Sequence, residues 1–138
     1  MIKEDCIFCK LANGAIPTRT LYEDEDFRVF MDASPATRGH CLIVPKNHYA
    51  DLSEIDDDVA AKVMPLAKKM MLKLKRTLNC DGFNVVQNNA ECAGQTVFHF
   101  HVHLIPRYNN DGQSINWVQQ SFDDSILDEI MDKVNQDC

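Results

Sequence analysis

The sequence has no long apolar run and little positive charge. None of its runs approaches the roughly 18 consecutive apolar residues of a membrane-spanning helix. Its first residues, Met-Ile-Lys-Glu-Asp, lack the apolar region of a secretory signal. Lys and Arg number 14 against 21 Asp and Glu, a net charge of −7, whereas nucleic-acid binding depends on clustered basic residues. We therefore expect a soluble, cytoplasmic protein with no nucleic-acid partner and no membrane contact.

Histidine is also scarce, with five residues in the chain, yet three of them lie close together. His99, His101 and His103 alternate with apolar residues, which is the period of a half-buried strand. The core face of this strand would consist of Phe98, Phe100, Val102 and Leu104. A row of imidazoles, which titrate near neutrality, suits nucleophilic or acid–base work on phosphoryl groups. The alternative is an exposed polar strand face without chemistry.

The length of 138 residues fits a single domain with its own core. Six cysteines could form disulfides in a secreted domain, but without a signal segment we expect them to be reduced. Cys41, Cys80, Cys92 and Cys138 are then ordinary thiols. The Cys6-x-x-Cys9 pair has the spacing of a tetrahedral metal site, although unliganded thiols are the alternative.

Apolar periodicity predicts an α+β fold, an antiparallel five-stranded meander sheet with one long helix and a C-terminal helix. Four strands are expected near residues 19–23, 26–31, 39–44 and 83–87, and the histidine segment is the fifth. The long helix runs from Ser53 or Asp56 to about Leu78, and Pro65 should kink or break it. The second helix starts near Ser121 and should pack against the body or a partner.

The segment from His99 to Ile105 matches the pattern His-φ-His-φ-His-φ-φ, in which φ is apolar. It resembles the motif of the histidine triad (HIT) hydrolases and nucleotidyl transferases. Further landmarks of that family occur in order at Cys6 to Lys10, Ile16-Pro17, Phe30 to Pro35, Gly39-His40, Val44 to His48 and Gly94 to Thr96. The resemblance implies a single HIT domain over 1–138, with a core at about 5–107, a C-terminal extension at 108–138 and a homodimeric assembly.

The resemblance also implies a catalytic mechanism. His101 would attack the α-phosphorus of a nucleotide and form a covalent nucleotidyl-histidine, which water then hydrolyses. His103 would contact the phosphoryl group or the bridging atom. Thr96 would donate a proton to the leaving group. Asn88 and Gln95 would stabilise charge on the phosphoryl oxygens.

The nucleotide-binding residues follow from the same resemblance. Asp32 matches an acidic residue that accepts both ribose hydroxyls, with a strand-end turn carboxylate as the alternative. The purine would lie between the apolar residues Phe8, Leu11, Ile16 and Phe30. His40 matches a further histidine near the nucleophile and has a supporting role, with a buried, hydrogen-bonded strand residue as the alternative.

A second site in related proteins binds zinc. By match, its ligands would be Cys6, Cys9, His48 and His99. Four protein ligands leave no open coordination position, so this zinc would be structural and no catalytic metal is expected.

The leading expectation for function is a Hint-like nucleoside phosphoramidase, which cleaves adenosine 5′-phosphoramidate to AMP and an amine. A Fhit-like dinucleoside polyphosphate hydrolase is the alternative enzyme, and residues 106–138 would distinguish the two. Histidine at position 103 disfavours the transferase branch, in which glutamine is typical. A nucleotide-binding scaffold module is the alternative without catalysis.

Overall fold

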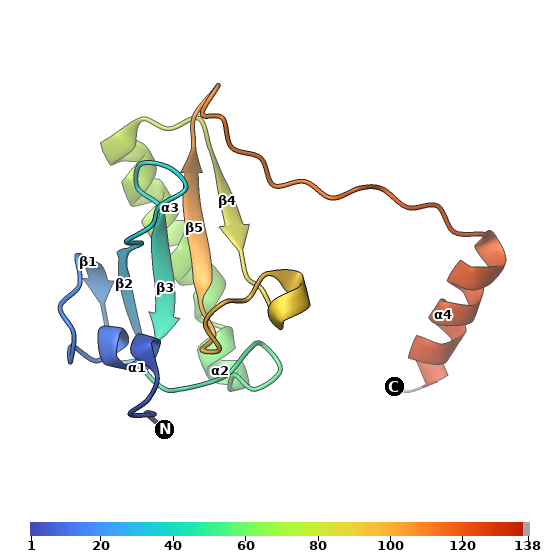
Figure 1. Cartoon of the computed structure of the whole chain (residues 1–138), viewed down its shortest axis with the longest axis horizontal. Coiled ribbons are helices and arrows are strands. Elements are labelled where there is room, and N and C mark those ends of the chain that lie inside the picture. Colours follow the sequence, from blue (N-terminus) through green and yellow to red (C-terminus); the bar gives the residue numbers. More distant parts are fainter. Residues whose placement is uncertain (137–138) are drawn as a thin grey trace.

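An antiparallel sheet of five strands forms the centre of the computed structural model, which describes residues 1–136. The strand order across the sheet is β1-β2-β3-β5-β4 (Figure 1). The strands are β1 (Thr20–Glu23), β2 (Phe27–Met31), β3 (Cys41–Pro45), β4 (Gly82–Val86) and β5 (Val102–Arg107). The predicted α+β fold is confirmed. The first three strands form the expected meander, but β4 occupies the far edge and β5 returns between β4 and β3.

Two helices connect β3 to β4, where the sequence predicted one. They are α2 (Asp57–Ala60) and α3 (Val63–Leu78). Pro65 is the third residue of α3, a position at which the backbone N–H has no partner within the helix. The expected long helix is therefore broken: α2 ends at Ala60, and α3 begins at Val63, two residues before the proline. Asn79 ends α3 in the left-handed conformation, with φ 53°.

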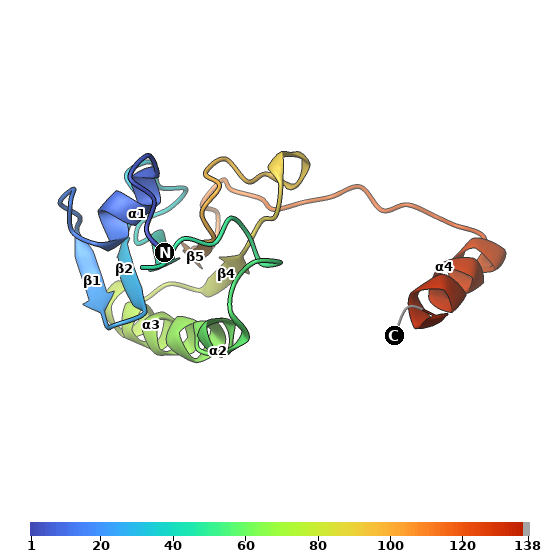
Figure 2. The same cartoon turned by 90° about the horizontal axis from the view of Figure 1, so that it is seen from below.

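The larger part of the core lies between α3 and one face of the sheet, which α2 and α3 cover in Figure 2. The helix contributes Val63, Leu66, Ala67, Met70 and Leu74, at the three- and four-residue steps of an amphipathic helix. The sheet contributes Phe27, Val29, Cys41, Ile43, Val102 and Leu104, and Phe100 joins them from the segment before β5. Burial of this apolar surface fixes the positions of β3 and β5, the two central strands.

The opposite face of the sheet carries the short helix α1 (Ile7–Ala12), as Figure 2 shows. A smaller apolar cluster joins this helix to the sheet and consists of Phe8, Ala12, Phe30, Leu42 and Val44. All of the histidine chemistry described below lies on this side.

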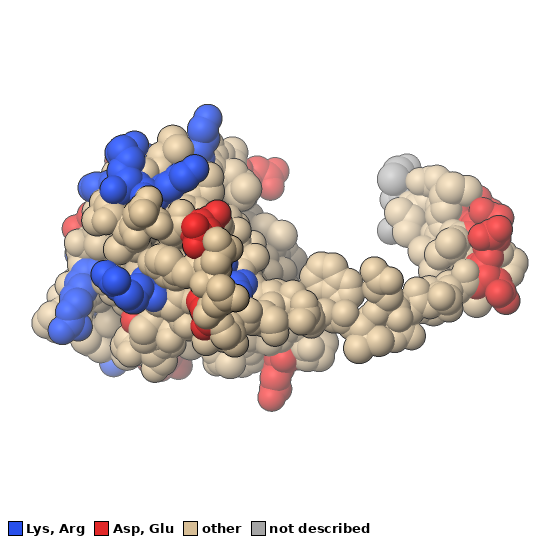
Figure 3. Space-filling model, turned by 90° about the horizontal axis from the view of Figure 1, so that it is seen from above, with Lys and Arg blue, Asp and Glu red and all other residues tan. Residues whose placement is uncertain are grey.

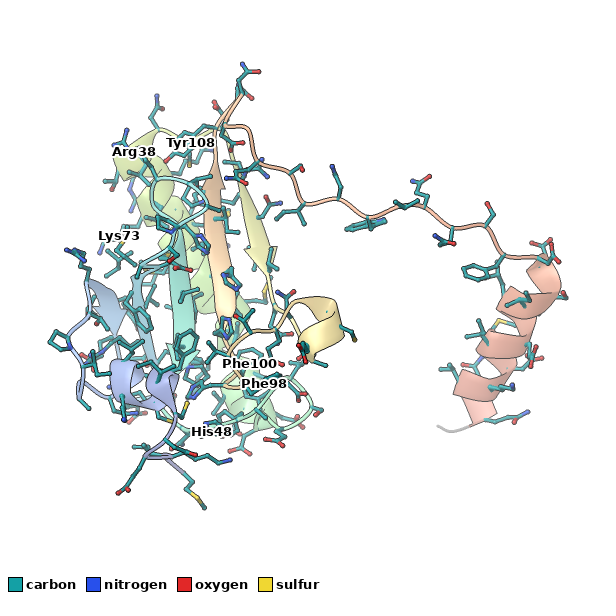
Figure 4. All side chains as sticks on the ribbon, viewed as in Figure 1. Arg38, His48, Lys73, Phe98, Phe100 and Tyr108 are labelled. Carbon is teal, nitrogen blue, oxygen red and sulfur yellow. The ribbon has the colours of Figure 1, made fainter. Side chains whose placement is uncertain are left out.

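The histidine segment is a strand only in its second half, because β5 begins at Val102. The pairing of Ile43 with Val102 would bring Pro45 opposite Phe100, and proline has no N–H with which to continue the ladder. The expected core face is correct for Phe100, which is 2% exposed, but wrong for Phe98, which is 54% exposed. The chain turns at residues 97–99 and carries Phe98 outward (Figure 4).

The chain leaves the body after β5 as an arm, here meaning residues 114–136. Residues 114–123 have no regular structure, and α4 (Asp124–Gln136) lies away from the sheet (Figure 1). The predicted second helix therefore exists. It does not pack against the body, and packing against a partner, the other expected arrangement, stays a prediction. Its apolar residues are exposed, namely Ile126, Leu127, Ile130, Met131 and Val134. Its acidic residues form the outer surface seen in Figure 3. Among residues 1–136, no helix is long and apolar enough to cross a membrane.

Candidate functional site

A cavity of about 920 Å³ opens on the α1 side of the sheet. Its wall brings together seven of the residues expected at the site, namely Phe8, Leu11, Phe30, Asp32, Thr96, His101 and His103. These residues come from α1, the end of β2 and the residue after it, the segment before β5, and β5 itself. A concave site that mixes aromatic and aliphatic side chains with a few polar groups has the composition of a small-ligand site.

His101 offers a single nitrogen to this cavity. Its Nδ1 lies 2.8 Å from the main-chain oxygen of His99, so Nδ1 carries the proton and donates it. Nε2 therefore keeps its lone pair. Burial lowers the pKa of His101, although the bond to the His99 carbonyl opposes this shift. A neutral imidazole with a free Nε2 at a cavity wall can act as a nucleophile.

His103, His40 and Asp32 form a second polar group beside His101. The Nε2 of His40 lies 3.0 Å from the Nδ1 of His103 and 3.5 Å from the Oδ2 of Asp32. Burial lowers the pKa of His40, and it lowers the pKa of His103 to about 4 with help from the neighbouring His101 and His40. Both imidazoles are therefore uncharged at neutral pH.

Three of the expected catalytic and nucleotide-binding residues lie outside the cavity wall, and so does His40, the expected supporting histidine. Gln95 is 2% exposed, and its side chain is fully engaged: Oε1 accepts from Ala90 N–H, and Nε2 donates to the carbonyl oxygens of Ala50 and Val97. The expectation that this amide contacts a phosphoryl group is therefore corrected, because the side chain holds the preceding loop instead.

Asn88 and Ile16 are the other two expected binding residues that lie outside the cavity wall. Asn88 lies beside the loop glycine, since a Cβ added to Gly94 would come 3.3 Å from the Nδ2 of Asn88. Gly94 has φ +99°, a conformation that favours glycine. Ile16 is only partly buried. Neither side chain reaches the wall formed by the histidines.

The wall also contains residues that the sequence did not point to, among them Arg19 and Ser34. Arg19 accepts a main-chain hydrogen bond from Met31 N–H at 3.0 Å and therefore lies beside the end of β2. Ser34 N–H donates to the Oδ1 of Asp32 at 2.8 Å. The predicted pairing of the first two strands could have placed Arg19 near Asp32, because the residue opposite a strand end is fixed by register.

Four further ligand-type side chains meet next to the cavity. The ligand atoms of Cys6, Cys9, His48 and His99 all lie within 4.8 Å of one another. These are the four residues that the family resemblance implied for zinc. Figure 4 shows His48 close to the end of α1 that carries the cysteines.

The geometry of this cluster fits a tetrahedral ion. Zn–S bonds of about 2.3 Å and Zn–N bonds of about 2.0 Å place sulfur and nitrogen ligands about 3.5 Å apart. The Nδ1 of His99 lies 3.4 Å from the Cys6 sulfur and 3.5 Å from the Cys9 sulfur. The Nδ1 of His48 lies 3.5 Å from the Cys9 sulfur.

The surroundings of the cluster also suit a metal. The Nε2 of His99 lies 2.9 Å from Pro45 O, so it donates its proton there and leaves Nδ1 for a ligand. Cys9 N–H donates to the Cys6 sulfur at 3.3 Å, and Lys3 N–H donates to the Cys9 sulfur at 3.4 Å. Burial lowers the pKa of His99 to about 4, which keeps its imidazole neutral.

Comparison with known proteins agrees with this architecture. A family model described as the HIT domain matches residues 13–110. An uncharacterised HIT-like protein of Methanocaldococcus jannaschii is 43% identical over 129 residues, which cover 94% of this chain and 98% of that protein. An adenosine 5′-monophosphoramidase of Candida albicans is 36% identical over 137 residues, which cover 96% of this chain and 90% of that protein.

Solved structures show the same similarity. A HIT family protein from Bacillus anthracis superposes with a TM-score of 0.89 at 38% identity, with 98% of each chain covered. A zinc-bound histidine triad family protein from Mycobacterium smegmatis gives a TM-score of 0.76 at 35% identity, with 84% of each chain covered. The matched motif, the shared sheet and these relatives together place the chain in the HIT family.

Proposed function

We propose that the protein hydrolyses purine nucleoside phosphoramidates, such as adenosine 5′-phosphoramidate, to AMP and an amine. The observation that carries this proposal is the commitment of His101 Nδ1 to the His99 carbonyl at 2.8 Å, which leaves Nε2 at the cavity wall as a nucleophile. The Candida albicans relative, named an adenosine 5′-monophosphoramidase, supports the choice of substrate.

The reaction would proceed in two displacements at phosphorus. His101 Nε2 forms a bond to the α-phosphorus while the P–N bond breaks, and the leaving amine takes the hydroxyl proton of Thr96, which solvent water replaces. A second water then attacks the nucleotidyl-histidine: its oxygen bonds to phosphorus, the bond from phosphorus to Nε2 breaks, and its proton goes to solvent as AMP leaves and the neutral imidazole is restored. His103 would donate a hydrogen bond to the phosphoryl group, on which charge increases in each transition state.

The same cavity would hold the nucleoside. Phe8, Leu11 and Phe30 provide an apolar surface on which a purine can pack. Asp32, at the end of β2, would accept hydrogen bonds from the ribose hydroxyls. Asn88 would contact the phosphate only after a movement of the loop around Gly94, because it lies outside the wall in this structure.

The deciding experiment compares adenosine 5′-phosphoramidate with diadenosine polyphosphates as substrates for the wild type and for His101→Ala. Preference for the P–N substrate, lost in the variant, is the expected result. Preference for the polyphosphates would instead assign a Fhit-like hydrolase. Nucleotide binding without turnover in either protein would assign a scaffold module.

We propose that Cys6, Cys9, His48 and His99 hold a structural zinc ion. When bound, zinc would tie α1 and the N-terminal residues to the sheet, and it leaves no coordination position for a substrate. Elemental analysis of protein purified without chelator should give close to one zinc per chain. Fully folded protein without metal would contradict this proposal.

We also propose a cytoplasmic homodimer in which the arm of each chain contacts the other. A 13-residue helix is marginally stable alone in water, and α4 exposes Ile126, Leu127, Ile130 and Met131. Burial against a second chain would remove this apolar face from water. Light scattering at micromolar concentration should give twice the chain mass, and Ile130→Glu should reduce it to a monomer. A monomeric wild type would contradict the proposal.

A further inference from the structure

A row of hydrogen bonds connects the base of the arm to the cavity. Gln113 Nε2 donates to the carbonyl oxygen of Ala36 at 3.0 Å. Ala36 N–H donates to the Nδ1 of His40 at 2.9 Å. The Nε2 of His40 lies 3.0 Å from the Nδ1 of His103, and the ring of His103 lines the cavity. Gln113 and His103, which are distant in sequence from the loop that contains Ala36, therefore contact it at Ala36 and at His40.

The direction of these bonds follows from the chemistry of neutral imidazole, which has one N–H and one lone pair. A backbone N–H can only donate, so the Nδ1 of His40 must hold the lone pair. The proton of His40 is then on Nε2, where it faces the Nδ1 of His103. His103 must accept at Nδ1, and its own proton is therefore on Nε2, the nitrogen that remains for the cavity.

Two features oppose any other proton arrangement. His40 is 5% exposed, and burial lowers its pKa, so a second proton on this ring is disfavoured. The Oδ2 of Asp32 lies 3.5 Å from the Nε2 of His40, and its negative charge favours a proton on that nitrogen rather than on Nδ1.

The same three side chains could be considered a metal site, because the ligand atoms of Asp32, His40 and His103 lie within 4.8 Å of one another. Coordination would require a lone pair on the Nε2 of His40. The N–H of Ala36 already occupies the other lone pair of that ring, so Nε2 carries the proton and cannot coordinate. The cluster is therefore a hydrogen-bond chain.

The loop that contains Ala36 is firmly held. Thr37 Oγ1 donates to Pro106 O at 2.6 Å, and Tyr108 Oη donates to Arg38 O at 2.7 Å. Figure 4 shows Arg38 and Tyr108 side by side at the end of β5 where the arm begins. Gln113 binds the same loop through its hydrogen bond to Ala36 O, and the main-chain oxygen of Gln113 accepts a hydrogen bond from the Arg107 guanidinium.

We propose that His40 and Gln113 are positioning residues. His40 fixes His103 in the tautomer whose Nε2–H donates into the cavity, and Gln113 holds the residue Ala36, whose N–H sets the tautomer of His40. The tautomer is a property of the free protein, whereas its benefit to catalysis rests on the proposed function. During turnover, His103 would then act as an uncharged donor to a phosphoryl oxygen.

The test is nitrogen NMR of histidine tautomers in the full-length protein labelled with ¹⁵N-histidine, at neutral pH with its metal retained. In the wild type we expect His103 to show a protonated Nε2 and an unprotonated Nδ1. Protonation of His103 at Nδ1 in the wild type would overturn the proposal at once, whatever the activity of the protein.

Two variants at position 40 separate positioning from packing. His40→Leu removes both bonds and should mix the tautomers of His103 and lower kcat about tenfold, with a smaller change in KM. His40→Gln retains an acceptor for Ala36 and a donor for His103, so it should restore the wild-type tautomer and most of kcat. An unchanged His103 tautomer in His40→Leu would overturn the proposal.

Gln113→Ala tests the remote anchor, and Gln119→Ala in the arm is its matched control. Loss of one neutral hydrogen bond should lower kcat by at most about fivefold in Gln113→Ala, with a partly mixed His103 tautomer. The control should match the wild type in both readouts. Equal behaviour of the two variants would remove Gln113 from the proposal.

Discussion

His99 and His101 are two residues apart on one segment, yet they present opposite nitrogens to their surroundings. His99 donates Nε2–H to Pro45 O and leaves Nδ1 among the cysteines. His101 donates Nδ1–H to His99 O and leaves Nε2 at the cavity. In both rings one N–H donates to a main-chain carbonyl, and the position of that carbonyl determines which nitrogen keeps its lone pair.

The two halves of the segment differ for the same reason. Up to His99 the chain bends, and His99 belongs to the metal-type cluster, which is Cys6, Cys9, His48 and His99. From Val102 the chain is a strand that pairs with β3 on one side and β4 on the other. His99 should therefore matter for stability and metal content. His101, just before the strand, and His103, within it, should matter for chemistry. Four predictions test this division.

The largest effect is expected for His101→Ala. Removal of the proposed nucleophile should lower turnover of adenosine 5′-phosphoramidate by at least about a thousandfold, because the proposed nucleotidyl-histidine could no longer form. Zinc content and melting temperature should remain close to the wild type. Loss of metal in this variant would break the division between the two histidines.

Phe98 and Phe100, on either side of His99, test the difference in packing between the two halves of the segment. Phe100→Ala removes a ring that is 2% exposed and should cost about 3–5 kcal/mol of unfolding free energy. Phe98→Ala changes a side chain that is 54% exposed and should cost less than about 0.5 kcal/mol. Urea denaturation measures both, and equal costs would mean that Phe98 is buried in solution.

Cys9→Ser tests the metal side of the comparison. Loss of one thiolate should remove zinc and lower the unfolding free energy by about 3 kcal/mol, since bound metal stabilises only the folded state. Cys92→Ser is the matched control, because Cys92 is exposed and outside the cluster. The remaining folded Cys9→Ser protein should retain turnover per folded molecule, and a loss beyond the unfolded fraction would contradict the division.

The smallest effect is a pH dependence on the cavity side. The pKa of His103 is about 4 in the folded protein and about 6.5 when unfolded, so the unfolded chain binds more protons between these values. The stability that depends on His103 should therefore be complete above pH 6.5 and fall towards pH 4, by about 3 kcal/mol for a fully buried ring and by about 2 kcal/mol for this partly exposed one. His103→Gln should show a shallower fall than the wild type. Metal loss at low pH affects both proteins, so the difference isolates His103.

Periodicity was sufficient for the fold but not for the bend in the histidine segment. The alternation correctly placed Phe100, Val102 and Leu104 in the core. It failed at Phe98 because the strand pairing stops before this residue. Pro45, at the end of the neighbouring strand β3, has no N–H with which to continue the pairing. Such an effect depends on register between distant residues, which no local pattern contains.

The site was predictable to different depths. The metal-type cluster and the wall residues Asp32 and His103 followed from family landmarks in the sequence. Gln95 did not, because its engagement by Ala90, Ala50 and Val97 depends on how two loops meet. The donor Ala36 N–H could not have been found either, because a backbone group has no signature in the sequence. Cys138 lies outside the described residues, so the expectation that it is an ordinary reduced thiol stays a prediction.

The antiparallel pairing of β3 with β5 has a consequence for the order of folding. It joins partners far apart in the chain, since His40 and His103 are separated by 63 positions and Cys6 and His99 by 93. Contacts of such long range form slowly. During synthesis, Cys6, Cys9 and His48 are available long before His99, so the ligand set is incomplete until β5 docks. Metal uptake and a complete cavity should therefore appear in refolding with one shared rate, that of the closing of the central strand pair.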